Sequence, residues 1–287
     1  MLAFVFPGQG SEKKGMGQGL FDEVREFASV ENEVDALLGY SLRKQCLEDA
    51  DNRLNQTQFT QPCLYTVNAL HYYKALLEGQ KPDYVAGHSL GEYDALLAAG
   101  VFDFLTGLKL VKRRGELMSQ AKGGGMAAVI GLAAEKILQV VKNEGLTSID
   151  VANYNSPTQT VISGPSDDIK HAAPKFEAAG ARMVIPLKAS AAFHSRYVAD
   201  AAKAFAEFLA PMTFAMPKIP VVANVTANLY PSDDISAAVK DLLVKQISNS
   251  VRWTQSVRFL AEHGVTDFKE VGPGNVLTKL IQQIRQA

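Results

Sequence analysis

Short apolar runs that read as strands alternate with helix-like stretches along most of this chain. Examples are the apolar runs at 2–6 and 84–87, and the more polar segment 267–272 also reads as a strand, whereas residues 21–40 have the apolar spacing of a helix. Parallel strands need a long crossover between them, so this alternation is typical of a mainly parallel sheet. The sequence therefore predicts an α/β fold.

Three consecutive glycines, 123–125, interrupt that alternation. The stretch after them, up to about residue 188, reads as strand, helix, strand, strand, helix, strand. That βαββαβ order is typical of a ferredoxin-like unit. We therefore predict a large domain made from residues 1–123 and 190–287, with a small ferredoxin-like subdomain, residues 124–189, inserted into it.

Composition excludes several classes of partner. The 29 Lys and Arg residues nearly cancel the 30 Asp and Glu residues, which leaves no basic surplus for a nucleic-acid backbone. Cys46 and Cys63 stand in apolar surroundings without C-x-x-C spacing, which favours buried thiols. No apolar run approaches the ~18 residues of a membrane span, and the N-terminus lacks a basic leader. We expect a cytoplasmic protein that binds neither nucleic acid nor membrane.

Residues 87–91, Gly-His-Ser-Leu-Gly, fit the pattern G-x-S-x-G between a predicted strand and a predicted helix. In that setting a sharp turn exposes the serine oxygen, and the glycines make room for the crowded backbone. The helix N-terminus also favours a developing negative charge. A glycine-rich turn without chemistry is the alternative, but the flanking strand and helix favour Ser89 as a nucleophile.

A serine hydroxyl needs a general base within hydrogen-bond reach. Three of the five histidines have structural explanations: His71, His171 and His263. His88 adjoins Ser89 but points elsewhere on the turn, so it is a candidate pocket residue rather than a base. His194, where the chain re-enters the large domain, remains as the candidate base.

No acidic residue stands in a convincing strand-end turn to orient that histidine. The candidates are Asp103, Asp150, Asp167 and Asp168. A catalytic triad and a Ser-His dyad steered by backbone carbonyls both stay open. Lys13 occupies the third glycine position of a dinucleotide fingerprint, and no Walker or metal-ligand pattern appears, so we expect neither a bound cofactor nor a metal.

Taken together, nine segments resemble the malonyl-CoA:acyl carrier protein transacylase family, in order and over nearly the whole chain. They are FPGQGS (6–11), TQP (60–62), GHSLGEY (87–93), RRGELM (113–118), GGGMAAVIG (123–131), NSPTQTVISG (155–164), AFHS (192–195), VRW (251–253) and VGPGNVLT (271–278). The chain is most similar to the free-standing, trans-acting acyltransferases of modular polyketide synthases. The resemblance implies a hydrolase-like large domain, malonyl-CoA and an acyl carrier protein as partners, and a monomer.

The resemblance also assigns roles to residues of the predicted site. It implies that Ser89 is acylated and that His194 is its base. The backbone N–H groups of Gln9 and Leu90 correspond to the oxyanion hole, and the main-chain carbonyl of Gln246 to the group that holds the histidine. These assignments would explain the missing acid.

Substrate selection is implied at five further positions. Arg114 corresponds to the arginine that pairs with the malonyl carboxylate; a planar guanidinium suits that task, although from the residues alone a solvated helix face is the simpler interpretation. Phe193 corresponds to a bulky residue that disfavours an α-methyl branch. The resemblance implies that Asn153 and Asn155 lie near the pocket mouth, although loop capping explains them nearly as well, and His88 is a candidate pocket residue from its place beside Ser89.

Two residues depart from the family pattern, and several rival functions stay open. Glu12 and Asp94 replace uncharged residues, and both are expected to add negative charge near the entrance. The nearest rivals are a proofreading hydrolase that clears acyl groups from carrier proteins and the malonyl transacylase of fatty-acid synthesis. A lipase-like esterase would need an acid and a lid, and a scaffolding protein would not need Ser89, His194 and Arg114 together.

Overall fold

One of the two four-stranded sheets is parallel throughout. The computed structural model describes residues 1–287, and the strands of this sheet are β1 (Leu2–Phe6), β2 (Tyr84–Gly87), β7 (Val221–Val222) and β8 (Asp267–Glu270). They lie in the order β7-β2-β1-β8, and every neighbouring pair is parallel. The predicted mainly parallel α/β domain is confirmed.

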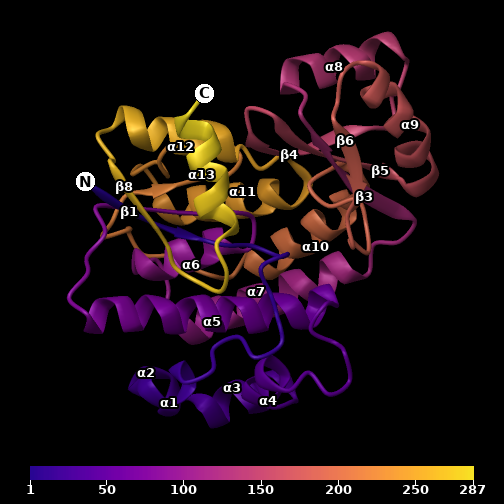
Figure 1. Cartoon of the computed structure of the whole chain (residues 1–287). Helices are drawn as coiled ribbons and strands as arrows, with labels where there is room; N and C mark the ends of the chain where they lie inside the picture. The colour runs from indigo at the N-terminus through magenta and orange to yellow at the C-terminus, as the bar shows by residue number, and fades with distance from the viewer.

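Helices cover both faces of this sheet (Figure 1). Phe4 and Phe6 point into a core shared with α5 (Thr57–Leu77), α6 (Gly91–Ala98) and α7 (Phe104–Ser119). The alternate residues Ala3 and Val5 pack against α12 (Trp253–Glu262) and α13 (Val276–Arg285). Side chains of a strand alternate between faces, so the all-apolar β1 is what a sheet covered on both sides requires.

Three further helices of the large domain lie beside these layers. They are η1 (Arg196–Val198), α10 (Ala199–Leu209) and α11 (Ile235–Ser248).

Both cysteines are buried and unpaired, as the apolar surroundings predicted. None of the helices combines the length and hydropathy that crossing a bilayer requires.

The single helix predicted over residues 21–40 is wrong. This region forms α1 (Leu20–Glu23), α2 (Arg25–Ala28) and α3 (Glu31–Leu38), followed by α4 (Leu42–Leu47). Val24 is buried with an extended backbone (ψ 100°), so the chain turns there. Arg43 ties the pieces together, because its guanidinium donates to Glu31 and to the Phe21 carbonyl. These contacts outweigh helical spacing.

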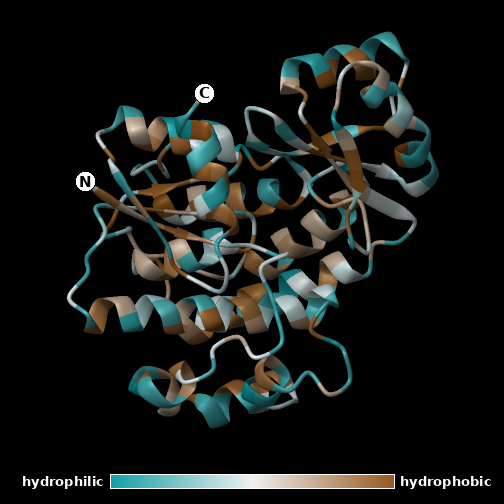
Figure 2. Cartoon of the chain, viewed as in Figure 1, coloured by the Kyte–Doolittle hydropathy of each residue, from teal (hydrophilic) through white to brown (hydrophobic).

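The second sheet belongs to the inserted part, at the right of Figure 1. Its elements are β3 (Gly124–Ile130), α8 (Ala134–Asn143), β4 (Asp150–Ser156), β5 (Gln159–Pro165), α9 (Ser166–Ala178) and β6 (Met183–Pro186). The order β4-β5-β3-β6, antiparallel throughout, confirms the ferredoxin-like arrangement. Its strands combine brown and pale stretches in Figure 2, and α8 and α9 turn teal faces outward.

The two parts meet along β4. The backbone N–H of Tyr154 donates to the carbonyl of Val251, and that of Val251 donates to the carbonyl of Ala152. The segment that follows α11 therefore continues the sheet of the inserted part by one parallel bridge. This junction brings β3 and β4 beside the end of β2, where Ser89 lies.

Candidate active site

Ser89 sits on a tight turn between β2 and α6. Its backbone is left-handed (φ 52°), a conformation that costs a residue other than glycine about 1 kcal/mol. The motif glycines are needed by the close backbone approach: a Cβ on Gly87 would lie 1.9 Å from Gly91, and one on Gly91 would lie 2.1 Å from the carbonyl oxygen of Phe6. The turn thus presses against the end of β1.

We expect Gly91→Ala to destabilise the protein by about 3 kcal/mol, because the new methyl group would overlap immobile backbone of β1. Urea unfolding would measure the change. Gly125→Ala is the matched control, since the nearest neighbour of its Cβ would be the movable Ser166 hydroxyl, at 3.2 Å, and the Ser166 backbone would lie at an ordinary contact distance of 3.6 Å. Equal stability of the two variants would contradict the close packing of the turn.

The structure brings His194 to Ser89, 105 residues away in the chain. The imidazole Nε2 lies 2.8 Å from Ser89 Oγ, and Nδ1 lies 2.8 Å from the main-chain carbonyl of Gln246. A carbonyl oxygen can only accept, so Nδ1 carries the proton and Nε2 has its lone pair free for the serine hydroxyl. Burial, with a smaller contribution from Arg114, lowers the pKa of His194 to about 3, so the imidazole is neutral at physiological pH.

None of the considered acids orients this histidine. Asp103 caps α7 by accepting from the Thr106 N–H, Asp150 pairs with Arg196, and Asp167 pairs with Lys170. Asp168 lies in the first turn of α9, in the other part of the fold. Of the two predicted arrangements, the geometry therefore matches a dyad steered by a backbone carbonyl.

Arg114 is buried at the nucleophile. The solvated helix face suggested by its sequence context is wrong, because only 1% of the residue is exposed. Its Nη2 donates to Ser89 Oγ at 3.1 Å and to Gln246 Oε1 at 2.9 Å, while Nε has no partner. The Tyr93 ring lies 5.5 Å from the guanidinium carbon. A buried cation with unused donors is suited to bind an anion.

The backbone amides of Gln9 and Leu90 flank the same turn. Neither N–H donates a hydrogen bond within the protein, although Leu90 is buried. Gln9 lines the pocket beside Ser89, and its side chain donates to the Thr57 hydroxyl at 3.3 Å. Two free N–H groups at such a position match the donors that an oxyanion needs.

A pocket of about 420 Å³ opens at Ser89, lined from both parts of the fold. Its apolar lining residues are Met118, Met126, Leu187, Ala189 and Phe193, and its polar ones are Gln9, Gly10, Glu12, Gln61, His88, Ser89, Arg114, Asn153, Lys188 and His194. The site therefore needs the inserted subdomain, which supplies Met126 and Asn153.

Asn155 does not line this pocket, contrary to its predicted place. Its carboxamide binds His88 Nε2 at 2.9 Å and donates to Gln159 at 3.1 Å. The His88 ring also packs edge-on against Trp253, so it is held away from Ser89. Burial lowers the pKa of His88. Asn155 thus holds a residue of the pocket wall and does not contact the cavity.

The two departures from the family pattern have different places. Glu12 lines the pocket, and its carboxylate accepts the Gly10 N–H at 2.6 Å. Asp94 does not lie at the entrance, because it is 1% exposed and accepts from the Asn68 carboxamide at 2.8 Å. Burial raises the pKa of Asp94 well above its usual range. The expectation for Asp94 is therefore wrong.

Three residues that support the site were missed in the sequence. Asn224 accepts the Ser89 N–H at 2.7 Å and donates to the Gly87 carbonyl at 2.6 Å, so it clamps the turn. Glu92, behind it, accepts from the Asn224 N–H and from the Tyr230 hydroxyl. Glu92 stands in the quoted segment 87–93, but nothing local shows that it is buried. Asn224 and Tyr230 follow no motif.

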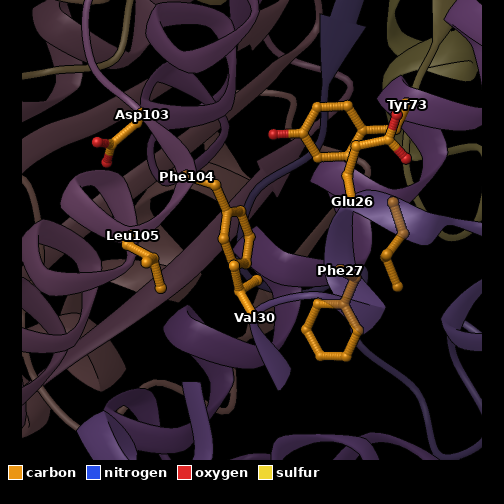
Figure 3. Close-up of a pocket in the computed structure, with 8 residues that line it drawn as sticks. Glu26, Phe27, Val30, Tyr73, Asp103, Phe104 and Leu105 are labelled. Atoms are coloured by element: carbon orange, nitrogen blue, oxygen red, sulfur yellow. The ribbon is translucent and has the colours of Figure 1, made fainter. Parts of the chain in front are cut away.

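A second pocket, of about 200 Å³, lies between α2, α5 and the start of α7 (Figure 3). Phe27, Tyr73 and Phe104 supply its rings, and Glu26 and Asp103 its carboxylates. It contains no histidine, serine or basic side chain that could activate or bind an acyl group. Across the whole chain, no group of three His, Cys, Asp or Glu residues is placed to hold a metal ion.

Comparison with known proteins agrees with this geometry. The acyl transferase domain family matches residues 3–286. A polyketide biosynthesis malonyl CoA-acyl carrier protein transacylase of Bacillus subtilis is 51% identical, with 100% of this chain and 98% of the relative covered. The malonyl CoA-acyl carrier protein transacylase of Escherichia coli is 41% identical, with 99% and 92% covered.

A solved structure shows the same fold. It is a malonyl-transacylase in complex with its type II polyketide synthase acyl-carrier protein. It has a TM-score of 0.93 and 37% identity, and the alignment covers 99% of this chain and 93% of that one. The chain therefore belongs to the acyl transferase family, together with these malonyl CoA-acyl carrier protein transacylases.

Proposed function

We propose that this protein moves a malonyl group from malonyl-CoA to the phosphopantetheine thiol of an acyl carrier protein through a malonyl-Ser89 intermediate. The observation that carries the proposal is the buried Arg114 guanidinium, 3.1 Å from Ser89 Oγ, with no carboxylate bound to it. A site for neutral acyl chains has no use for a buried cation, whereas the free carboxylate of malonate neutralises it.

In the first half-reaction, Ser89 Oγ attacks the thioester carbonyl while His194 Nε2 takes the hydroxyl proton. The backbone N–H groups of Gln9 and Leu90 hold the resulting oxyanion, and the Gln246 carbonyl stabilises the imidazolium through Nδ1. The carbon–sulfur bond then breaks. CoA leaves as a thiol with the proton that His194 returns.

In the second half-reaction, His194 deprotonates the carrier's phosphopantetheine thiol, which attacks the malonyl-serine ester. The ester oxygen leaves as Ser89 Oγ and recovers the proton from His194. Atoms and charges balance without a redox step, and each proton transfer uses His194. We propose that one chain suffices as a monomer, because every group named here comes from this chain.

We propose that the reaction supplies extender units to a polyketide synthase. Support comes from the Bacillus relative, which is named for polyketide biosynthesis and is more similar than the Escherichia enzyme. Phe193 lines the pocket and is 5% exposed, and its bulky ring leaves less room for an α-methyl branch than a small side chain would, so we expect malonyl to be preferred over methylmalonyl.

The test is intact-mass analysis after mixing the protein with malonyl-CoA or acetyl-CoA, followed by a chase with a phosphopantetheinylated carrier protein. We expect a malonyl adduct that passes to the carrier faster than to water. An adduct formed equally from acetyl-CoA and lost mainly to water would contradict the transferase and favour the proofreading hydrolase.

Arg114→Ala should lower the malonyl acylation rate by about 10- to 100-fold and leave acetyl acylation much less affected, because it removes a charge-assisted pair. Arg114→Lys should recover only part of the rate, since an ammonium lacks the planar fork. Rapid-quench acylation with each thioester would measure this. The neighbouring Arg113→Ala is the control, and an equal loss with both thioesters would contradict carboxylate recognition by Arg114.

A further inference from the structure

A buried chain of three side chains runs behind the nucleophile from Arg114 through Gln246 to Glu92. The guanidinium donates to Gln246 Oε1 at 2.9 Å, and Gln246 Nε2 donates to Glu92 Oε2 at 2.5 Å. All three residues are at most 1% exposed. A buried cation and a buried anion thus face the same neutral carboxamide and make no direct ion pair.

The orientation of the carboxamide follows from its neighbours. A guanidinium has only donors and an ionised carboxylate only acceptors, so the oxygen of Gln246 must face Arg114 and its nitrogen must face Glu92. Gln246 Nε2 also donates to the main-chain carbonyl of Ser89 at 2.8 Å. Glutamine is neutral and offers both kinds of group, so it suits this place between the two charges.

A direct Arg114–Glu92 pair would change the pocket. Arginine and carboxylate groups tend to form two parallel hydrogen bonds, which use both the donors and the charge of the guanidinium. The substrate carboxylate would then compete with the Glu92 carboxylate for the guanidinium. Glu92 would have the advantage, because it is part of the protein and does not have to bind from solution. The carboxamide prevents this competition by keeping the resident anion one side chain away.

We propose that Gln246 and Glu92 are specificity-determining residues: the Gln246 carboxamide is a neutral spacer that keeps the Glu92 carboxylate from pairing with Arg114, so the guanidinium stays available to a diacid thioester. The inference rests on the proposed function. The Glu92 carboxylate balances the charge of Arg114 without touching it, because the Gln246 side chain lies between the two groups. The second role of Gln246, orienting His194, belongs to its main-chain carbonyl and does not depend on its side chain.

Exchanging the two side chains tests the spacer without changing the charge of the site. In Glu92→Gln with Gln246→Glu, the new carboxamide at 92 can still accept from Tyr230 and Asn224 and donate to residue 246. The anion moves next to Arg114. Acylation by malonyl-CoA and acetyl-CoA would be measured in the same variant at about pH 8, because burial raises the pKa of Glu92 only to about 7 and the acid is then ionised.

We expect the malonyl-to-acetyl ratio of acylation rates to fall by about 10- to 100-fold in the exchanged variant, with the loss concentrated in KM for malonyl-CoA. Gln246→Met, neutral and of similar length, should keep the ratio even if both rates fall. Gln246→Glu alone also places a carboxylate beside Arg114. If the double variant does not fold, the malonyl-to-acetyl ratio of this single variant is compared with that of the wild type instead.

The outcomes separate the inference from the function on which it rests. A wild-type protein that takes malonyl no faster than acetyl overturns the proposed function and the spacer together. A wild-type preference for malonyl that the exchanged variant retains overturns the spacer alone. A ratio that falls as far in Gln246→Met as in the exchanged variant also overturns it, because the site would then need the glutamine contacts and not the separation of charges.

Discussion

Ser89→Ala should abolish the malonyl adduct and lower transfer to the carrier protein by at least about 1000-fold. The hydroxyl is the only group that lies both 2.8 Å from His194 Nε2 and 3.1 Å from Arg114 Nη2. Without it the neutral imidazole has no proton to take, and no oxygen lies where the ester must form. Intact-mass analysis and a carrier-loading assay would measure the two losses.

Ser156→Ala is the matched control, because Ser156 is also buried but its hydroxyl has no hydrogen-bond partner and does not line the pocket. It should acylate like the wild type. A malonyl adduct of normal yield on Ser89→Ala would place the nucleophile elsewhere and contradict the mechanism. Because residue 89 has a left-handed backbone, the stability of the variant should also be measured, so that a lost turn is not mistaken for a lost nucleophile.

Much of the fold was predictable because the relevant signals are local. The apolar runs of β1 and β2 are buried on both faces of the sheet, so nearly every residue in them had to be apolar. The inserted part was recognisable from the glycine run at 123–125 and from the complete βαββαβ order that follows it. Ser89 was recognisable for the same reason, since its strand, turn and helix are contiguous.

What the sequence could not predict depends on contacts between distant segments. The Glu92 carboxylate accepts hydrogen bonds from Asn224, Tyr230 and Gln246, which lie 132, 138 and 154 residues away in the chain. The periodicity of apolar residues does not predict contacts between residues so far apart in the sequence. Burial of a charged residue is equally hidden. Arg114 lies in a stretch rich in lysine and arginine that suggests a solvated surface. Asp94 was expected near the entrance because it replaces an uncharged residue directly after the segment 87–93. In the N-terminal region, tertiary contacts of Arg43 replaced one helix by several short ones.

The resemblance to the family assigned one role that the sequence pattern alone could not assign. Gln246 could be assigned a main-chain role from its place in the family pattern, and its carbonyl does lie 2.8 Å from His194 Nδ1. The role of its side chain could not be assigned that way, because it depends on where two buried charges lie relative to each other. Any residue at position 246 could provide the main-chain carbonyl. A side chain that accepts from a cation and donates to an anion must carry both kinds of group, as a carboxamide does.

His194→Ala should lower the acylation rate by about 100- to 10,000-fold, because Ser89 then lacks a general base. Stopped-flow or rapid-quench acylation would measure the loss. His171→Ala is the control, since His171 is an exposed residue of α9. A loss of less than about 10-fold would show that another group takes the serine proton, and would contradict the assignment.

The pH dependence distinguishes a buried base from an ordinary one. Because the pKa of His194 is lowered to about 3, its neutral, active form persists in acid, and the acylation rate constant should stay nearly constant from about pH 6 to about pH 5, an interval below the pKa of about 7 of Glu92. A solvated histidine would lose most of its activity over that interval.

The same shift has a cost in stability. The unfolded chain binds a proton at this histidine below about pH 6.5, whereas the folded protein does so only near a pH of about 3, so His194 destabilises the fold as the pH falls between these values. Arg114→Ala removes a positive neighbour and should therefore raise the pKa of His194, which moves the acid limb of the rate profile to higher pH. An unmoved limb in that variant would show that burial alone lowers the pKa, and that Arg114 influences the substrate but not the base.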